Sequence, residues 1–287
     1  MRFHRSPGVS TAPRRRSGHT GLSRFGLAAV VAVALAACGS VDEDAYYERP
    51  VESLYNEAMD LLSGGAYRGA ADAFDEVERQ HPYSVWATKA QIMAAFAQYQ
   101  ANAYDDAVLA AKRFIDLHPG HRDVAYAYYL IAISYYEQIS DVGRDQKMTE
   151  LAFERLDEVI RRFPDTAYAR DAKLKLDLAR DHLAGKEMEV GRFYLRRGEH
   201  IAAINRFQIV VEKYQTTTHV PEALHRLTEA YLALGVTDEA QATAAVLGYN
   251  YPGNEWYQDS YVLLTGVDLR PQEDKGSWIS RAWNSVF

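Results

Sequence analysis

Residues 67–82 read YRGAADAFDEVERQHP, and in this stretch the alanine Ala70 stands twelve positions before Pro82. The same spacing recurs four more times along the chain. The five alanines are Ala70, Ala107, Ala152, Ala203 and Ala240, and the residues twelve positions later are Pro82, Pro119, Pro164, Gln215 and Pro252. A small residue at a fixed distance from a residue that ends a helix, repeated in this way, indicates an internal repeat.

A second position of this repeat is always apolar. The residues seven positions after the alanines are Val77, Phe114, Val159, Val210 and Leu247. This spacing puts the alanine and the apolar residue on one side of a helix, two turns apart. A small side chain lets two helix axes approach closely, and proline ends a helix because it lacks an N–H donor and restricts the preceding residue. We therefore expect hairpins of two helices, with the alanine on the second.

These hairpins resemble the tetratricopeptide repeat, a helix-turn-helix unit of about 34 residues. The sequence predicts an all-α fold, a tetratricopeptide-repeat α-solenoid of about five helical hairpins, with a long helix from Ala167 to Arg196 that links an N-terminal and a C-terminal half. The predicted parts are a signal peptide (1–37), a tether (38–51), an N-terminal half of three repeats (52–165), a C-terminal half of two repeats with the long connecting helix (166–264), and a polar linker with a short amphipathic C-terminal helix (265–287).

The N-terminus has the pattern of an export signal. Residues 1–37 contain six arginines and no acidic residue, and the chain is apolar from Gly26 to Ala37. That apolar stretch is about a dozen residues long, shorter than the roughly 20 that a helix needs to cross a bilayer. It ends in Leu35-Ala36-Ala37-Cys38, which resembles the bacterial lipobox. We expect Cys38 to carry an S-diacylglycerol and an N-acyl group; a buried core cysteine is the alternative.

The residue after Cys38 indicates which membrane holds the protein, and the charge of the remaining chain indicates which class of partner it does not bind. Gly39 stands where an aspartate would mark retention in the inner membrane, so a lipid-anchored protein of the outer membrane, facing the periplasm, is favoured. Without residues 1–37 the chain has 26 basic and 39 acidic residues, a net charge near −13. Such a charge argues against nucleic acid as a partner.

No motif for catalysis is apparent in the sequence. It has no G-x-S-x-G, no phosphate-binding glycine loop and no H-E-x-x-H. His118 and His121 form at most a weak metal pair, and the repeat explains His118 better, because other repeats also hold a ring residue at its position. We expect no catalytic site, no metal, and no cofactor apart from the lipid on Cys38.

Aromatic side chains are frequent on or next to the expected first helices of the hairpins. They are Tyr55, Trp86, Phe96, Tyr99, Tyr126, Tyr128, Tyr129, Tyr135 and Tyr136. In stacked repeats the first helices line an inner surface that binds extended peptides or partner helices. Tyrosine suits this role because it combines apolar area with a hydroxyl group. The alternative for each single ring is packing between repeats, and the sequence leaves both possibilities open.

Several motifs follow one another in a fixed order. They are the lipobox cysteine, YRGAA (67–71), HPYS (81–84), GRDQ (143–146), and the stretch from Val190 to Gly198 that runs into IAAINRF (201–207). Together they resemble the BamD family, outer-membrane lipoproteins of the β-barrel assembly machinery, over essentially the whole mature chain.

The resemblance implies a non-catalytic scaffold. Its C-terminal half would dock a POTRA domain of a BamA-type barrel protein, and its N-terminal half would recognise targeting segments of unfolded outer-membrane β-barrel proteins. Other lipoproteins of the Bam complex are further implied partners.

The resemblance also implies roles for single residues of the N-terminal half. Arg68 matches a basic position beside the substrate groove and would meet the terminal carboxylate of a substrate. Tyr83, Trp86 and Tyr99 are the other predicted groove residues. A solvated position on the helix surface is the alternative for Arg68.

Three more residues are predicted to bind partners. Arg206 matches the family arginine that faces an acidic POTRA residue, with helix packing or solvation as the alternative. Arg144 and Asp145 lie in the insertion of the third repeat. They either contact a partner or cap the loop and the helix after it.

Two rival functions and one C-terminal feature remain. A rival of the same structural class is another repeat lipoprotein of the envelope, Tol-Pal-associated or serving pilus assembly. The Tol-Pal type would carry a coiled coil, which the segment from Cys38 to Glu52 lacks. A periplasmic enzyme would need a further domain of about 100 residues, and only roughly 30 lie beyond the repeats.

The spacing of Ile279, Trp283 and Phe287 predicts a short amphipathic helix that packs on the last repeat or meets a partner.

Overall fold

The computed structural model describes residues 48–285, so the predicted signal peptide, Cys38 and Phe287 lie outside the described residues. From Arg49 onward the chain forms one compact unit. Within the described range there are twelve α-helices and no β-strand. They are α2 (Val51–Ser63), α3 (Tyr67–Gln80), α4 (Val85–Gln100), α5 (Tyr104–Leu117), α6 (Val124–Tyr136), α7 (Lys147–Arg162), α8 (Ala167–Arg196), α9 (His200–Lys213), α10 (Val220–Ala233), α11 (Thr237–Asn250), α12 (Glu255–Thr265) and α13 (Trp278–Asn284). None of these helices is both long and apolar enough to cross a membrane.

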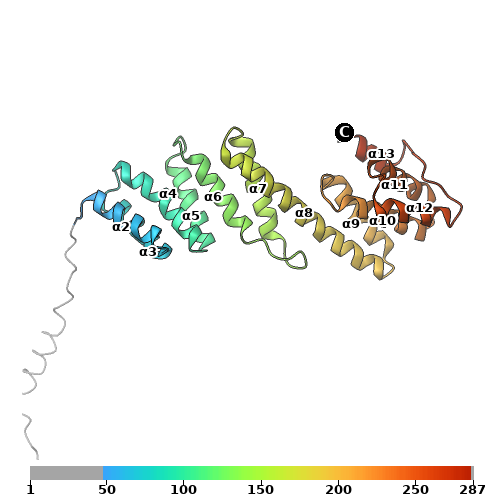
Figure 1. Cartoon of the computed structure of the whole chain (residues 1–287), viewed down its shortest axis with the longest axis horizontal. Helices are drawn as coiled ribbons and strands as arrows, with labels where there is room; N and C mark the ends of the chain where they lie inside the picture. The colour runs from blue at the N-terminus through green and yellow to red at the C-terminus, as the bar shows by residue number, and fades with distance from the viewer. Residues whose placement is uncertain (1–47, 286–287) are drawn as a thin grey trace, which may run out of the picture. The chain divides into compact units, whose positions relative to one another are not determined.

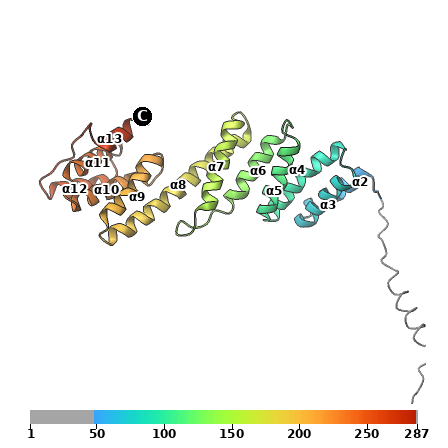
Figure 2. The same cartoon turned by 180° about the vertical axis from the view of Figure 1, so that it is seen from behind.

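Consecutive helices pack as hairpins in chain order (Figure 1), and the reverse view shows the same succession (Figure 2). The five hairpins are α2/α3, α4/α5, α6/α7, α8/α9 and α10/α11, and they are followed by α12 and α13. The first helices α2, α4, α6 and α8 also pack on one another in succession. The prediction of a tetratricopeptide-type α-solenoid is confirmed, and α8 is the predicted long helix.

The repeated alanines lie where the two helices of each hairpin cross. All five, from Ala70 to Ala240, are completely buried, and so are the five apolar residues seven positions later. Each alanine belongs to the second helix of its hairpin. The small side chain at the crossing and the apolar side chain two turns later therefore set the distance and the rotation of each second helix against its first.

The five second helices end in one common backbone conformation. Their C-cap residues have φ between −133° and −125° and ψ between 38° and 58°. These residues are His81, His118, Phe163, Tyr214 and Tyr251. Tyr214, which precedes Gln215, has the lowest ψ of the five, 38°. The other four precede proline, which disfavours the helical conformation in the residue before it.

Four of the five hairpins turn through a residue with a positive φ. These residues are Gly65, Asn102, Gly198 and Gly235. After each of them a backbone N–H donates back to a carbonyl of the first helix, as from Ala66 to Leu61 at 2.9 Å. This bond satisfies a carbonyl that the helix end leaves without a partner. Glycine or asparagine is found at these positions because other residues pay a steric cost there.

The third hairpin has the predicted insertion in place of this short turn, and the loop packs on the middle of α8. Gln146 is buried at the end of the loop and its side chain donates to the carbonyls of Asp141 and Arg144, both at 3.1 Å. A Cβ at Gly185 of α8 would lie 3.4 Å from Val142 of the loop and 3.2 Å from His219. Residue 185 is therefore a point of close approach for two different segments.

The C-terminal helix α13 packs on the last hairpins. Ile279 is fully buried and Trp283 nearly so, within the same hydrophobic cluster as α9 to α11. The Trp283 Nε1 donates to Asn250 Oδ1 at 3.0 Å. Of the two possibilities left open for this segment, the structure shows the first, a helix that covers the last repeat.

Candidate functional site

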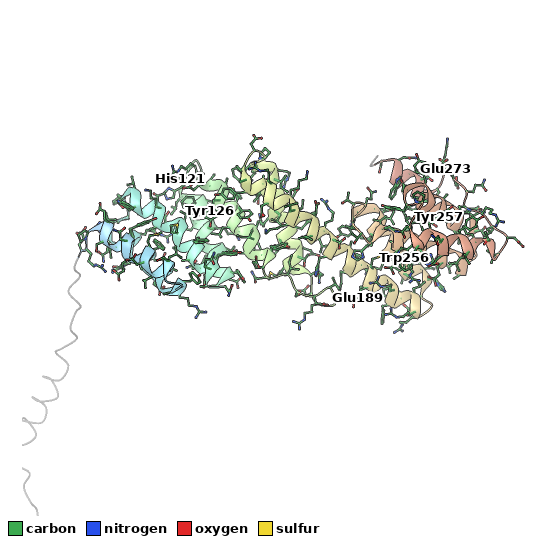
Figure 3. The ribbon with its side chains drawn as sticks, in the orientation of Figure 1. His121, Tyr126, Glu189, Trp256, Tyr257 and Glu273 are labelled. Atoms are coloured by element: carbon green, nitrogen blue, oxygen red, sulfur yellow. The ribbon has the colours of Figure 1, made fainter. Side chains whose placement is uncertain are left out.

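The aromatic side chains of the first helices form a continuous patch in the N-terminal half. We call Tyr99 of α4, Tyr126 and Tyr129 of α6, and Tyr168 of α8 the tyrosine face. The Tyr126 and Tyr168 rings have centroids 5.4 Å apart, and the Tyr129 and Tyr168 rings stack at 5.3 Å. Figure 3 labels Tyr126, whose helix α6 lies between α4 and α8. The patch therefore joins three successive first helices.

The hydroxyl groups of this face are engaged by carboxylates. The Tyr129 hydroxyl donates to Asp171 of α8, and the Tyr99 hydroxyl donates to Glu137 at 3.3 Å. Lys175 Nζ lies 2.9 Å from the Asp171 carboxylate. Two of the four hydroxyls of the tyrosine face are thus held by carboxylates of the same chain.

Burial raises the pKa of three phenols of this face, Tyr99, Tyr126 and Tyr129. It is the largest cause for Tyr99, whose pKa rises to about 12, and Glu137 adds to the shift. The pKa values of Tyr126 and Tyr129 are also raised by burial. Burial alone would raise the pKa of Asp171, but the hydrogen bonds from Tyr129 and Lys175 outweigh it and lower that pKa. Near neutral pH these three phenols are therefore neutral and Asp171 is ionised.

A second aromatic group lies at the start of the repeats. The rings of Tyr55 and Trp86 have centroids 4.8 Å apart, and Tyr55 also meets the buried Phe74 at 5.5 Å. Lys89 Nζ lies 4.8 Å from the centroid of a Trp86 ring. Trp86 is partly buried against the first hydrophobic cluster. Its ring therefore serves packing on one side and remains open to Lys89 and solvent on the other.

The four predicted groove residues do not lie together. Arg68 is exposed in the first turn of α3 and lines a shallow depression that also includes Ala101, two residues after Tyr99. Tyr83 is fully exposed, 101% by relative area, in the turn between α3 and α4, and Trp86 lies in the first turn of α4. The 14 residues of α3 separate these two ends by about 20 Å. Tyr99 alone of the four belongs to the tyrosine face.

Two residues were not predicted from the sequence: Tyr168, which belongs to the tyrosine face, and Asp171, which accepts the hydrogen bond from Tyr129. Tyr168 and Asp171 lie on the long helix α8, outside the short first helices in which aromatic residues were sought. The signal that would have found them is the alignment of the first turns of α8 with the start of α6. Both helices begin a few residues after a proline, Pro119 for α6 and Pro164 for α8.

Arg206 lies on α9 and forms an ion pair inside the chain. Its Nη1 lies 3.1 Å from Glu187 Oε2 of α8, and 41% of its side chain is exposed. Glu187 is more buried, with 21% of its side chain exposed. The guanidinium is thus held in place by one carboxylate while part of it still faces solvent.

Arg144 and Asp145 are exposed in the insertion loop. The Asp145 carboxylate accepts a hydrogen bond from the backbone N–H of Lys147 at 3.3 Å, at the start of α7. The Arg144 carbonyl accepts one from the side chain of Gln146. Asp145 therefore supports the loop and the following helix, which was one of the two possibilities, while the Arg144 side chain forms no ion pair with the described residues.

His118 and His121, the weak metal pair of the sequence, each have a hydrogen-bond partner within the chain. His118 Nε2 lies 2.8 Å from Gln91 Oε1, and His121 Nδ1 accepts from the N–H of Asp123 at 3.2 Å. Within residues 48–285 no three histidine, cysteine or acidic side chains come together as a metal site would require.

The succession of packed helical hairpins defines the class of protein, a tetratricopeptide-type repeat protein. A family model described as "Outer membrane lipoprotein" (YfiO) matches residues 47–247. Three relatives bear the name "Outer membrane protein assembly factor BamD". The one from Caulobacter vibrioides is 51% identical over 247 residues, covering 85% of this chain and 81% of the relative. The chain belongs to the BamD family of outer-membrane lipoproteins.

Two more distant relatives agree with this assignment. The protein of Rickettsia prowazekii is 46% identical over 235 residues, covering 82% of this chain and 94% of its own length. That of Neisseria meningitidis serogroup A is 36% identical over 235 residues, covering 77% and 88%. The predicted family is confirmed, and it associates the chain with the outer membrane.

Proposed function

We propose that this protein is a non-catalytic scaffold of the β-barrel assembly complex, anchored in the outer membrane through lipid on Cys38 and facing the periplasm. The observation that carries the proposal is the 51% identity, over 85% of the chain, to a protein named as an outer-membrane protein assembly factor. The absence of a catalytic constellation in the sequence and the repeat fold agree with a binding function.

The tyrosine face is the proposed contact for segments of unfolded outer-membrane β-barrel proteins. Its rings span α4, α6 and α8 and supply apolar area, which an extended segment with aromatic or branched side chains would cover. Arg68 stands at the same end of the repeats as Tyr99 and is exposed for a substrate carboxylate. Tyr83 and Trp86 would extend the contact towards the other end of the first hairpins.

The C-terminal half is the proposed docking site for a BamA-type barrel protein through its POTRA domain. Arg206 would meet an acidic POTRA residue, and its pair with Glu187 would hold the guanidinium ready. Arg144 and Asp145 are proposed as further contacts, because the insertion loop projects their side chains into solvent. Other lipoproteins of the complex are also proposed partners.

A pull-down from envelopes in mild detergent tests the proposal. Wild-type protein should recover a BamA-like barrel protein, and Arg206→Glu should recover much less of it, because a carboxylate there would face the acidic partner. Glu187→Gln is the matched control, since it removes the internal pair but keeps the arginine. Absence of a BamA-like protein from the wild-type sample would contradict the proposed function. Equal recovery with Arg206→Glu would remove only the role of Arg206.

A further inference from the structure

Helix α13 shows what kind of ligand fits between two second helices of this solenoid. It packs against α9 and α11, and both cartoon views place it beside α11 (Figures 1 and 2). The Trp278 Nε1 donates to the hydroxyl of Tyr231 on α10 at 2.9 Å, and Ile279 is fully buried. A short amphipathic helix thus fills a groove whose walls are α9 and α11 and whose floor is α10.

The repeat places an equivalent groove in the N-terminal half, with walls α5 and α7 and floor α6. Tyr231 is the twelfth residue of α10, and the twelfth residue of α6 is also a tyrosine, Tyr135. Gln208, whose Nε2 donates to Tyr231 at 3.1 Å, stands five positions after its crossing alanine. The residue five positions after the crossing alanine of α5 is Lys112.

Unlike the groove under α13, this one is not covered by any described part of the chain. A cavity of about 230 Å³ lies in it, lined by Lys112, Ile115 and Asp116 of α5, Tyr128 and Ile131 of α6, and Arg155 and Glu158 of α7. This volume is suited to one large side chain. The groove between α3 and α5 is different, because Arg113 and Gln91 both bind Glu78 across it.

Polar groups of the uncovered groove lack partners that a ligand would supply. Arg155 Nη1 lies 2.8 Å from Glu158, but the Arg155 Nε is buried without a hydrogen-bond acceptor. Lys112 is exposed, and neither it nor the Tyr135 hydroxyl has a bond to another described residue. Tyr135 holds the position in α6 that Tyr231 holds in α10, and it interacts electrostatically with Arg155 of α7. Because Arg155 already pairs with Glu158, the exposed Lys112 is the cation left for a ligand carboxylate, and the phenol can accept an N–H as Tyr231 does.

We propose that the α5–α6–α7 groove binds a short amphipathic helix of a partner protein, seated as α13 is seated between α9 and α11. The helix would present an aromatic N–H donor to Tyr135 and, on its side facing α5, an acidic residue to Lys112. The surface is separate from the tyrosine face and from Arg206, so the inference does not depend on the substrate or the BamA-type partner. The α13 of the same chain is not available for it, because both of its tryptophans are engaged in its own groove.

Two labelled peptides probe the groove on the full mature chain by fluorescence anisotropy. One copies residues 275–285 (KGSWISRAWNS), and the other carries Ala282→Glu. Ala282 follows Trp278 by one turn, and the Trp278 indole meets the same Tyr231 hydroxyl that Gln208 of α9 binds, so the new carboxylate would face Lys112 in the equivalent groove. We expect the Glu peptide to bind more tightly than the parent peptide.

Groove variants decide where the peptide binds. Tyr135→Phe should weaken binding of the Glu peptide roughly three- to tenfold, as expected for one lost hydrogen bond. Lys112→Glu should make the Glu peptide bind no more tightly than the parent peptide. Lys173→Glu, at an exposed lysine of α8, is the matched control and should change nothing. Circular dichroism checks that each variant is folded. Failure of both peptides to bind, or binding that Tyr231→Phe weakens while Tyr135→Phe and Lys112→Glu do not, would overturn the proposal.

Discussion

The two halves of the solenoid bury their apolar side chains in different ways. In the C-terminal half one hydrophobic cluster runs from Ala184 of α8 to Trp283 of α13. The N-terminal half has three separate clusters, around Phe74, around Phe114 and around Leu156. In repeat proteins, stability is a sum of units and of the interfaces between neighbours. A continuous core suits the docking of one partner that we propose for the C-terminal half, and separate cores suit the binding of segments of different sequence that we propose for the N-terminal half.

Buried polar contacts follow the same division. In the C-terminal half the hydroxyls of Thr228 and Thr243 lie 2.9 Å apart in the core, and His225 Nδ1 lies 2.9 Å from Ser260. In the N-terminal half the Thr149 hydroxyl donates to Gln146 at 2.9 Å where the insertion loop meets α7, and Tyr129 donates to Asp171 at the half-buried tyrosine face. The C-terminal half therefore joins helices of its core through polar groups, and the N-terminal half uses such groups to hold the insertion loop and to orient a surface.

The largest effect is expected from a matched pair of core truncations, Phe207→Ala and Phe74→Ala. Both phenylalanines follow their crossing alanine by four positions and are completely buried. Each truncation should cost about 3–5 kcal/mol of unfolding free energy, measured by urea denaturation. Hydrogen exchange should rise over α9 to α13 for Phe207→Ala but only over α2 to α4 for Phe74→Ala. Equal spread in both variants would contradict the difference between the halves.

A smaller effect is expected where a helix must come close to a ring. A Cβ at Gly191 of α8 would lie 2.4 Å from the buried Phe207 ring. Gly191→Ala should therefore destabilise the C-terminal half by about 1–3 kcal/mol through overpacking. Gly69→Ala is the control, since the nearest atom to its Cβ would be Leu61 Cδ1 at 3.9 Å, and a helical alanine should there be neutral or stabilising. Similar melting temperatures for the two variants would show that the close approach does not matter.

The attachment of α13 should respond to the loss of one hydrogen bond. Trp278→Phe removes the donor to the Tyr231 hydroxyl and should cost about 1 kcal/mol, with faster hydrogen exchange in α13. Combining it with Tyr231→Phe should cost less than the sum of the two single changes, because both remove the same bond. Strict additivity would mean that the two side chains do not interact in solution.

The smallest effect is a dependence of the C-terminal half on pH. Burial lowers the pKa of His225 below its usual 6.5, and the nearby Arg226 adds to the shift. The stability linked to His225 is therefore fully present above pH 6.5 and is lost as the pH falls through the lowered pKa. His225→Gln should flatten the pH dependence of C-terminal unfolding between pH 7 and 5, a range chosen to bracket about 6.5. An unchanged pH profile would assign the acid sensitivity to other groups.

The helical hairpins of this fold could be predicted because each crossing and each helix end accepts only certain residue types. A buried crossing such as that at Ala203 accepts only a small side chain, and a residue such as His81 before proline takes a non-helical conformation. The long helix was equally evident, because no proline interrupts Ala167 to Arg196.

The surfaces could be predicted less well, because they depend on which helices meet. Tyr168 stacks on Tyr129 across 39 positions of sequence, and no local pattern records that contact. The destination of α13 was likewise open, since Trp278 meets Tyr231 only after the linker has folded back. The family resemblance singled out Arg206 but could not show its pair with Glu187, which lies on the preceding helix.

The central claim is a division of labour between the halves, and one paired experiment tests it most directly. Tyr99→Ala and Arg206→Glu are each assayed for binding of a labelled C-terminal peptide of a barrel protein and for recovery of the BamA-like protein from envelopes. Tyr249→Ala, at an 86% exposed tyrosine of α11, serves as the control. We expect Tyr99→Ala to weaken only the peptide and Arg206→Glu to weaken only the BamA-like partner. If each variant weakens both activities equally, the division between the halves is wrong.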